Sequence, residues 1–123
     1  MSTPVSTPVL DTRLLGKPSK FSGNIGDWAQ WKFQVSNYLQ LVDADLPDEI
    51  EAAMAKTEPI TVDPAQNPTL FARGRTLYAI TVSLLSPGRP MTLARSVRSR
   101  SGWELWRLLG VEYEPARSSR ALV

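Results

Sequence analysis

Apolar side chains follow a helical pattern most clearly between residues 27 and 42. Large ones recur there every three or four positions, which is the spacing of one helix face: Trp28, Trp31, Val35, Tyr38, Leu39 and Val42. Gly23, Asn24 and Gly26 interrupt any earlier element, and Asp27 offers a carboxylate to the free amides of a first turn. The pattern therefore predicts a helix over 27–42.

Two tryptophans one turn apart make this helix dependent on a partner. Each aromatic ring buries on the order of 150–250 Å² when it is covered, so a helix with Trp28 and Trp31 on one face is not stable alone in water. A second indole pair, Trp103 and Trp106, occurs near the end of the chain. We expect both pairs to meet inside one helical core, with Phe21 packed against the start of the first helix.

A shorter apolar pattern predicts a second helix over 46–56. Asp43 or Asp45 precedes it as a capping residue, and Pro47 suits its first turn. The same segment carries a group of carboxylates, namely Asp43, Asp45, Asp48 and Glu49. Such a group is compatible with acid–base or metal chemistry. Beside a helix start, and without ligands of other types, we interpret these carboxylates as capping and solvated charges.

Asn67 and Pro68, a capping residue followed by a favoured first-turn residue, begin a third predicted helix over 68–86. The SPGRP segment at 86–90 ends it. Gly74 lies on its apolar side, where glycine costs about 1 kcal/mol relative to alanine unless another element comes close. We expect that close neighbour to be a tryptophan of the first helix.

The rest of the pattern predicts one or two helical turns over 91–97 and a last helix over 102–113. Ser101 and Glu104 have the spacing of a capping box, and Pro115 ends the helix. The final residues, RSSRALV, have the pattern of a further helix that is cut short. We therefore expect the chain to be truncated at its C-terminus.

Together these elements predict an all-α fold, a small bundle of four or five helices. We assign residues 17–123 to one helical domain. Residues 1–16, in which the tetrapeptide STPV occurs twice, are assigned to a flexible N-terminal tail. The predicted core consists of large side chains from several helices: Trp28, Trp31, Tyr38, Leu77, Tyr78, Trp103, Trp106 and Tyr113.

The composition of the 123 residues removes most enzyme chemistry. The chain has neither cysteine nor histidine, so a thiol nucleophile, an imidazole base and a Cys/His zinc site are excluded. We expect no catalytic residue, cofactor, metal ion or small-molecule substrate. No apolar run reaches the roughly 20 residues that span a bilayer, and the N-terminus lacks a signal-peptide pattern. We expect a cytoplasmic or nuclear protein that is neither secreted nor bound to a membrane.

Charge is distributed unevenly along the chain. Residues 1–66 carry five basic and nine acidic side chains, a net charge of −4, whereas residues 67–123 carry nine arginines and three glutamates, a net charge of +6. This asymmetry is compatible with an acidic face that meets the basic face of another copy, and with contact between the basic half and phosphate. It is also compatible with two solvated surfaces that differ in sign.

Arginines gather in the segment before the last helix: Arg89, Arg95, Arg98 and Arg100. Arginine forks suit phosphate oxygens, and the ring of nearby Trp103 is a surface on which a nucleic-acid base can stack. These four arginines are the candidate nucleic-acid contacts, with Arg107 one helix away. The alternative is a solvated connector beside a tryptophan that belongs to the core.

Two motifs resemble the capsid region of Gag proteins from long-terminal-repeat retrotransposons. The first, F-S-G-x-x-x-x-W-x-x-W-x-x-x-x-x-x-Y-L, is made by Phe21, Gly23, Trp28, Trp31, Tyr38 and Leu39. The second, W-x-x-L-x-x-x-Y-x-P, is made by Trp106, Leu109, Tyr113 and Pro115, and Arg117, Arg120 and Leu122 follow it. The likeness covers roughly residues 17–123 and depends on the order and spacing of aromatic residues. It does not separate the copia-like from the gypsy-like branch.

The resemblance implies a structural, non-enzymatic domain like the N-terminal capsid lobe, which self-associates into particles around the element's own RNA. Its partners would be further copies of the chain and RNA. Family members often carry a zinc knuckle, which a chain without cysteine and histidine cannot form. The alternative is a helical adaptor that binds protein or nucleic acid through Arg95, Arg98 and Arg100.

Overall fold

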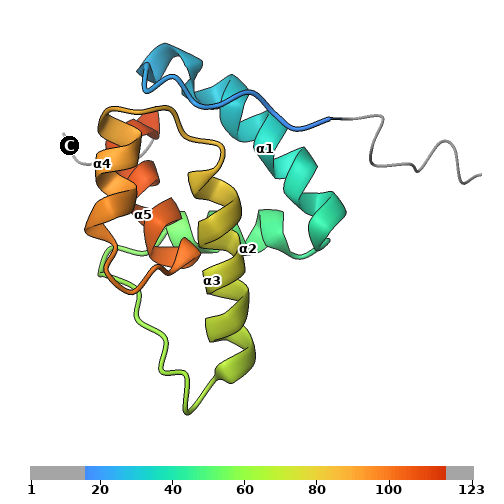
Figure 1. Ribbon diagram of the computed structural model, residues 1–123, viewed down its shortest axis with the longest axis vertical. Helices are drawn as coiled ribbons and strands as arrows, with labels where there is room; N and C mark the ends of the chain where they lie inside the picture. Colours follow the sequence, from blue (N-terminus) through green and yellow to red (C-terminus); the bar gives the residue numbers. More distant parts are fainter. Residues whose placement is uncertain (1–15, 116–123) are drawn as a thin grey trace, which may run out of the picture.

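The computed structural model describes residues 16–115, and within them it is all-helical. Figure 1 shows its five α-helices, and a short 3-10 helix, Ile25–Asp27, precedes the first of them. In chain order the helices are α1 (Trp28–Val42), α2 (Leu46–Met54), α3 (Pro68–Val82), α4 (Arg89–Ser96) and α5 (Gly102–Tyr113). The predicted all-α bundle is confirmed. The predicted tail, apart from Gly16, and the final RSSRALV segment lie outside the described residues.

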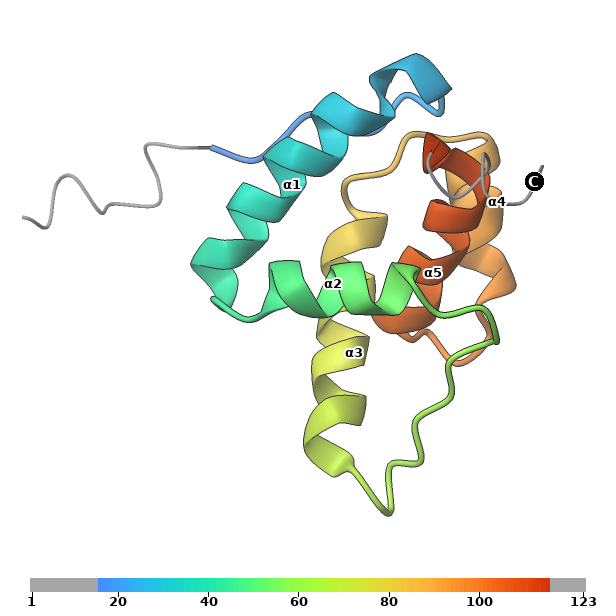
Figure 2. The same cartoon turned by 180° about the vertical axis from the view of Figure 1, so that it is seen from behind.

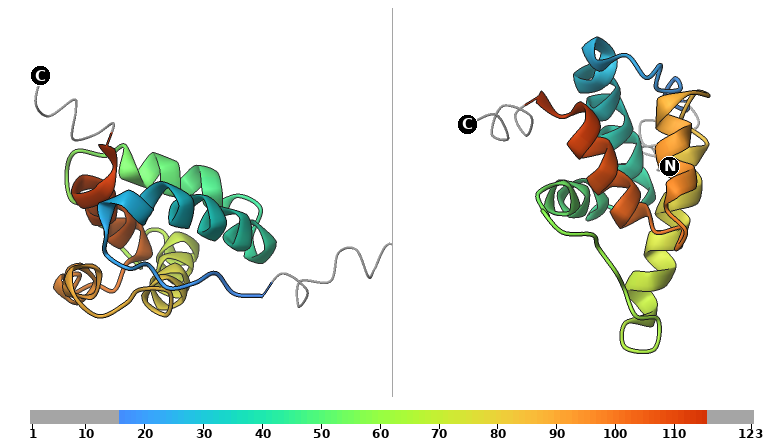
Figure 3. Two further views of the ribbon diagram at one scale, coloured as in Figure 1. Left: turned by 90° about the horizontal axis from the view of Figure 1, so that it is seen from above. Right: turned by 90° about the vertical axis from the view of Figure 1, so that its left-hand side faces the viewer.

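Helix α5 lies at the centre of the bundle. It contacts α2, α3 and α4, and Figure 3 shows α1 and α2 on one side of it and α3 and α4 on the other. Buried residues occupy most of its circumference: Gly102, Trp103, Leu105, Trp106, Arg107, Leu109, Gly110 and Tyr113. A helix that is apolar on nearly all sides is stable only inside a fold, so the other helices are arranged around this one.

Five aromatic rings form the heart of the core. Phe21 lies in the segment that runs beside α1 (Figures 1 and 2), and its ring centre is 5.0 Å from that of Trp31 and 4.8 Å from that of Tyr113. Trp28 and Trp31 both face Trp106, at 6.1 Å and 5.6 Å between ring centres. The prediction that Phe21 packs on the first helix is confirmed.

The two indole pairs meet only in part. Trp106 joins the tryptophans of α1, but Trp103 packs on α3 instead, where its Nε1 donates a hydrogen bond to the Leu70 carbonyl at 3.2 Å. A Cβ atom at Gly74 would lie 2.7 Å from that same Nε1. The expected close approach at Gly74 is therefore present, but its partner comes from α5 and not from the first helix.

Of the predicted core residues, Tyr38 and Tyr78 are half-buried and the others are buried. Tyr38 lies at the edge of α1, where it borders a surface hollow. Tyr78 places its hydroxyl 2.7 Å from the Ala94 carbonyl oxygen, to which it donates, so its polar end connects α3 to α4. Both rings still pack against the core.

Several predicted boundaries and caps are wrong, among them the end of α2, which is at Met54 and not at residue 56. Helix α3 ends at Val82, four residues early, because Phe21 forms a parallel bridge with Leu85. The Phe21 amide donates to the Leu84 carbonyl at 2.8 Å, which takes this backbone out of the helix. Helix α4 begins at Arg89, within the segment predicted to be a connection.

The predicted cap at Asp27 is also replaced. The Asp27 carboxylate accepts a hydrogen bond from the Ser22 hydroxyl at 2.7 Å, and it makes no capping bond to α1. The Asn24 side chain instead accepts from the Gly26 amide at 2.9 Å and so caps the 3-10 turn. At the other helices the Asn67 cap is present, whereas the Asp45 side chain makes no capping bond to α2, and the Asp43 carboxylate accepts from the Asp45 amide at 2.9 Å.

The buried hydroxyl of Tyr113 generates the first testable prediction. Tyr113 is 4% exposed, and its Oη has no hydrogen-bond partner among the described residues. A buried polar group without a partner destabilises the fold, so Tyr113→Phe should raise the free energy of unfolding by about 1 kcal/mol. Tyr78→Phe is the matched control, because it removes a hydroxyl that donates to Ala94, and it should lower that free energy by about 1 kcal/mol. Urea unfolding measures both, and equal losses in the two variants would contradict the prediction.

Candidate interaction surfaces

Most charged groups on the helices join one element to another. Arg73 on α3 binds both carboxylate oxygens of Glu49 and also Asp43, with its Nη2 2.9 Å from Asp43 Oδ2. Its guanidinium carbon lies 5.7 Å from the centre of the Trp103 ring. Two of the carboxylates interpreted as caps or solvated charges therefore hold α3 against the α1–α2 junction. Hydrogen bonds from the Asp45 amide and from Arg73 lower the pKa of Asp43.

Lys32 is the only charged residue of α1, and it is held against neighbouring elements. Its Nζ lies 3.2 Å from Glu51 Oε2 and 3.0 Å from Glu114 Oε1. The same Glu114 oxygen accepts from the Trp28 indole at 2.9 Å. Burial alone would lower the pKa of Lys32, but the hydrogen bonds to Glu114 and Glu51 outweigh it and raise that pKa.

Glu104 joins α5 to the loop before α3 and to Arg107. It accepts from the Ile60 amide at 2.7 Å and from Arg107 at Nε and Nη2, at 2.9 Å and 2.7 Å. Burial raises the pKa of Glu104, but the hydrogen bonds from Arg107 and Ile60 outweigh this and lower it. Arg107 is 8% exposed, so it is not available for anion contact. The capping box is half formed. The Ser101 hydroxyl accepts from the Glu104 amide at 3.5 Å, whereas the Glu104 carboxylate accepts from the Ile60 amide in the loop.

The structure divides the four predicted nucleic-acid contacts into two places. Arg89 lies at the start of α4 and pairs with Glu112 at 3.0 Å. Arg95 is in the last turn of α4, about 9 Å further along the helix axis. Arg98 and Arg100 follow in the connection to α5. All four are exposed, but no ion pair within residues 16–115 involves Arg95, Arg98 or Arg100.

Arg75 lies beside the second of these places, the α4–α5 connection, and the sequence did not predict this. Arg75 on α3 and Ser99 in the α4–α5 connection line one small hollow of about 20 Å³, together with Val62, Phe71, Ser101 and Trp103. The guanidinium carbon of Arg75 lies 5.6 Å from the centre of the Phe71 ring. We call Arg75, Arg98, Arg100 and Phe71 the arginine surface. The i, i+4 spacing of Phe71 and Arg75 was the only signal available in the sequence.

Trp103 does not supply the stacking ring that the sequence suggested for this place. Its side chain is 4% exposed, and its indole N–H is bonded to Leu70. Phe71, one helix away in the chain, is half-buried and borders the same hollow. The exposed aromatic surface beside the arginines therefore belongs to Phe71.

The side of α1 that faces away from the core carries no charge. Its exposed residues are Ala29, Gln30, Phe33, Gln34, Asn37, Gln40, Leu41 and Val42, which we call the outer face of α1. Phe33 is 65% exposed, the highest value among the large apolar side chains described. Leu41 and Val42 are 44% and 52% exposed. An uncharged face with a protruding phenyl ring can be covered by another protein without loss of ionic hydration.

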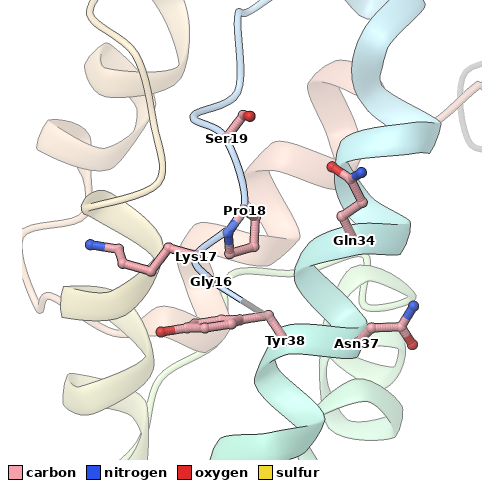
Figure 4. A pocket seen from close by; sticks show the side chains of 7 residues that line it. All are labelled: Gly16, Lys17, Pro18, Ser19, Gln34, Asn37 and Tyr38. Atoms are coloured by element: carbon pink, nitrogen blue, oxygen red, sulfur yellow. The ribbon is translucent and has the colours of Figure 1, made fainter. Parts of the chain in front are cut away.

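Two larger hollows border α1. One of about 210 Å³, here the α1–α3 hollow, is lined by Val42, Asp43, Leu46, Ala72, Arg73, Thr76, Leu77 and Ile80. The other, of about 300 Å³, lies between residues 16–19 and α1, and Figure 4 shows Tyr38, Gln34 and Asn37 along its α1 side. Gly16, Lys17, Pro18 and Ser19 line its opposite side.

Residues 16–115 contain neither a metal-ligand cluster nor a membrane-spanning helix. No three histidine, cysteine, aspartate or glutamate side chains gather there as ligands of a metal ion would. None of the described helices combines the length and apolar character that crossing a bilayer requires.

Glu104 generates a prediction about pH. Its carboxylate has a folded-state pKa below the ordinary 4.5, so its contribution to stability is complete above that value and is lost as the pH falls through the folded-state pKa. Glu104→Gln should lower the free energy of unfolding at pH 7 by about 2 kcal/mol, and the difference from wild type should shrink below pH 4.5. Glu112→Gln, which breaks the exposed pair with Arg89, should change stability by less than about 1 kcal/mol at any pH. Urea unfolding across pH checks both, and a pH-independent Glu104→Gln loss would contradict the assignment.

The surfaces that remain for partners are the outer face of α1, the α1–α3 hollow and the arginine surface. Comparison of the chain with protein-family models, with curated proteins and with solved structures finds no match. What these surfaces bind is therefore inferred from their own chemistry.

Proposed function

We propose that this chain is a structural, non-enzymatic domain that self-associates inside the cell, in the manner of the Gag capsid regions that its motifs resemble, with RNA as the packaged partner. Phe33 on the uncharged outer face of α1 is the observation that carries this proposal. Leu41 and Val42 on the same helix are exposed as well, and a group of apolar side chains left in water favours cover by another protein. A second copy that covers this group removes it from water.

The motif residues support the proposal in a second way. Phe21, Trp28, Trp31, Trp106 and Tyr113 come from both motifs, and their rings form one cluster. The aromatic residues that carry the resemblance thus act together in building the core. The surfaces outside that core differ from one another in chemistry. A domain that contacts its own copies through two different surfaces needs such a difference.

The most suitable receptor for Phe33 is the α1–α3 hollow of another copy. Its volume of about 210 Å³ is lined largely by apolar side chains, among them Leu77 and Ile80. Phe33 lies roughly 13 Å along α1 from Val42, the residue of α1 that borders this hollow, so a contact between the ring of one copy and the hollow of another would be heterologous and would extend into chains of copies instead of closing as a dimer. Burial of one phenylalanine contributes about 2 kcal/mol, which corresponds to weak association that needs several contacts per copy.

A mixing experiment tests this proposal. Phe33→Ala removes the ring, and Thr76→Glu places a charge in the exposed wall of the hollow, so each variant should associate roughly tenfold more weakly than wild type by light scattering. Mixed together, the two variants should form heterodimers, because each retains the half that the other lacks. Val111→Ala removes an exposed apolar side chain on α5, 46% exposed, and should associate like wild type.

Two results would count against self-association through these surfaces. A wild-type chain that stays monomeric at high concentration, with and without RNA, contradicts the function itself. Loss of association in Phe33→Ala without rescue in the mixture contradicts the heterologous contact and points to a symmetric one between two outer faces.

The second candidate is a helical adaptor that binds an acidic partner through Arg95, Arg98 and Arg100. Their exposure, and the lack of any ion pair to them within residues 16–115, favour it. Charge reversal at these three positions would abolish binding by an adaptor and leave self-association through Phe33 intact.

A further inference from the structure

The arginines of the described chain fall into two classes. Arg73, Arg89 and Arg107 each form ion pairs, with Glu49 and Asp43, with Glu112 and with Glu104 respectively. Arg75, Arg95, Arg98 and Arg100 form none with any described residue. The first class is explained by the fold, whereas the second leaves positive charge in water.

The second class is gathered by the fold and not by the sequence alone. Arg75 comes from the middle of α3, and Arg98 and Arg100 stand on either side of Ser99 in the α4–α5 connection. Arg75 and Ser99 border the same hollow, and Arg98 and Arg100 are the exposed chain neighbours of Ser99, so the fold brings their segment next to Arg75. Figures 1 and 3 show this connection beside α3. Arg95, one turn earlier on α4, extends the same charge.

The backbone conformation of Arg100 is energetically unfavourable. It has a φ of 55°, in the left-handed region where glycine or asparagine is usual, and its amide donates to the Val97 carbonyl at 3.1 Å. A non-glycine residue in this conformation costs on the order of 1 kcal/mol. Such a residue on a surface connection has no packing reason to be an arginine, which points to a role for its charge.

The hollow itself is too small for a nucleotide. At about 20 Å³ it has room for roughly one water molecule. A ligand must therefore lie across the surface and reach several arginines at once, as a phosphate backbone does. Asp63 follows Val62, which lines the hollow, and its carboxylate accepts from the Ala65 amide of the same loop at 2.9 Å.

The position of the Phe71 ring favours binding of a single-stranded nucleic acid over a duplex. Its half-buried ring stands beside Arg75, so a base that has left its stack can pack on the aromatic and guanidinium surface. Bases inside a duplex are stacked on each other and cannot make this contact.

We propose that the arginine surface binds the backbone and unstacked bases of a single-stranded nucleic acid. Arg75, Arg98 and Arg100 contact phosphates, and Phe71 stacks on a base. This inference rests on the proposed function for its choice of RNA over other polyanions, but the surface lies apart from Phe33 and is tested separately from self-association.

The experiment is fluorescence anisotropy of the full chain with labelled oligonucleotides of about 16 nucleotides, oligo(U) RNA and oligo(dT) DNA, across a salt series. The wild type should give a log–log salt slope of about −2, which is three phosphate contacts at roughly −0.7 each. The triple variant Arg75→Gln, Arg98→Gln, Arg100→Gln should bind at least tenfold more weakly with a slope near zero. Binding of RNA but not DNA would identify the 2′-hydroxyl as part of the recognition, and equal binding identifies the shared backbone.

Matched controls separate the surface from general charge. Arg89→Gln removes the same charge from an arginine that Glu112 already holds, and it should bind like wild type. Phe71→Leu should lose roughly threefold or more in affinity with the salt slope unchanged, because stacking is lost while phosphate contacts remain. Phe33→Ala should retain full RNA binding even where self-association is lost, so failure of one proposal is not failure of the other.

Three outcomes would overturn the inference. These are a triple variant that binds RNA like wild type, an Arg89→Gln variant that loses as much as the triple variant, and duplex RNA bound as tightly as single strands with no effect of Phe71→Leu. A chain that binds an acidic peptide but no oligonucleotide would assign the surface to a protein partner instead. Circular dichroism melting of each variant confirms that it is folded.

Discussion

Four buried indoles require four hydrogen-bond acceptors inside the fold, and each acceptor comes from another segment. Trp106 donates to the Thr81 hydroxyl at 2.9 Å, and Trp103 donates to the Leu70 carbonyl at 3.2 Å, so both connect α5 to α3. Trp31 donates to the Ser19 carbonyl and Trp28 to Glu114. Burial of the rings supplies the driving force, whereas these directional bonds determine which segments lie together. They join α5 to α3, and α1 to the segment before it and to the residue after α5.

The sequence predicted what depends on near neighbours in the chain. The Asn67 cap, the 102–113 helix and the existence of all five helices follow from spacing and local capping chemistry. It did not predict what depends on distant partners. The early end of α3 needs Phe21, and the neighbour of Gly74 is decided by the bond from Trp103 to Leu70.

The ion pairs show which charged side chains hold the fold together and which remain on the surface. A count of charges along the sequence does not show this. The acidic first half and basic second half suggested two opposed faces, but part of that difference is used internally, by the ion pairs of Arg73 with Glu49 and Asp43. The arginine surface remains because its members lack such partners among the described residues. Its composition could not be read from the sequence, since Arg75 and Ser99 are 24 positions apart and meet only at one hollow.

The contact between Phe21 and Tyr113 also determines when the domain can form. The two rings, 4.8 Å apart, belong to opposite ends of the described chain. Closing so long a loop costs conformational entropy before any contact repays it. During synthesis, the first two helices leave the ribosome without the ring that completes their core, and they must wait for the last helix. The core is therefore completed only after α5 has left the ribosome, and until that moment the tryptophans of α1 are accessible to chaperones.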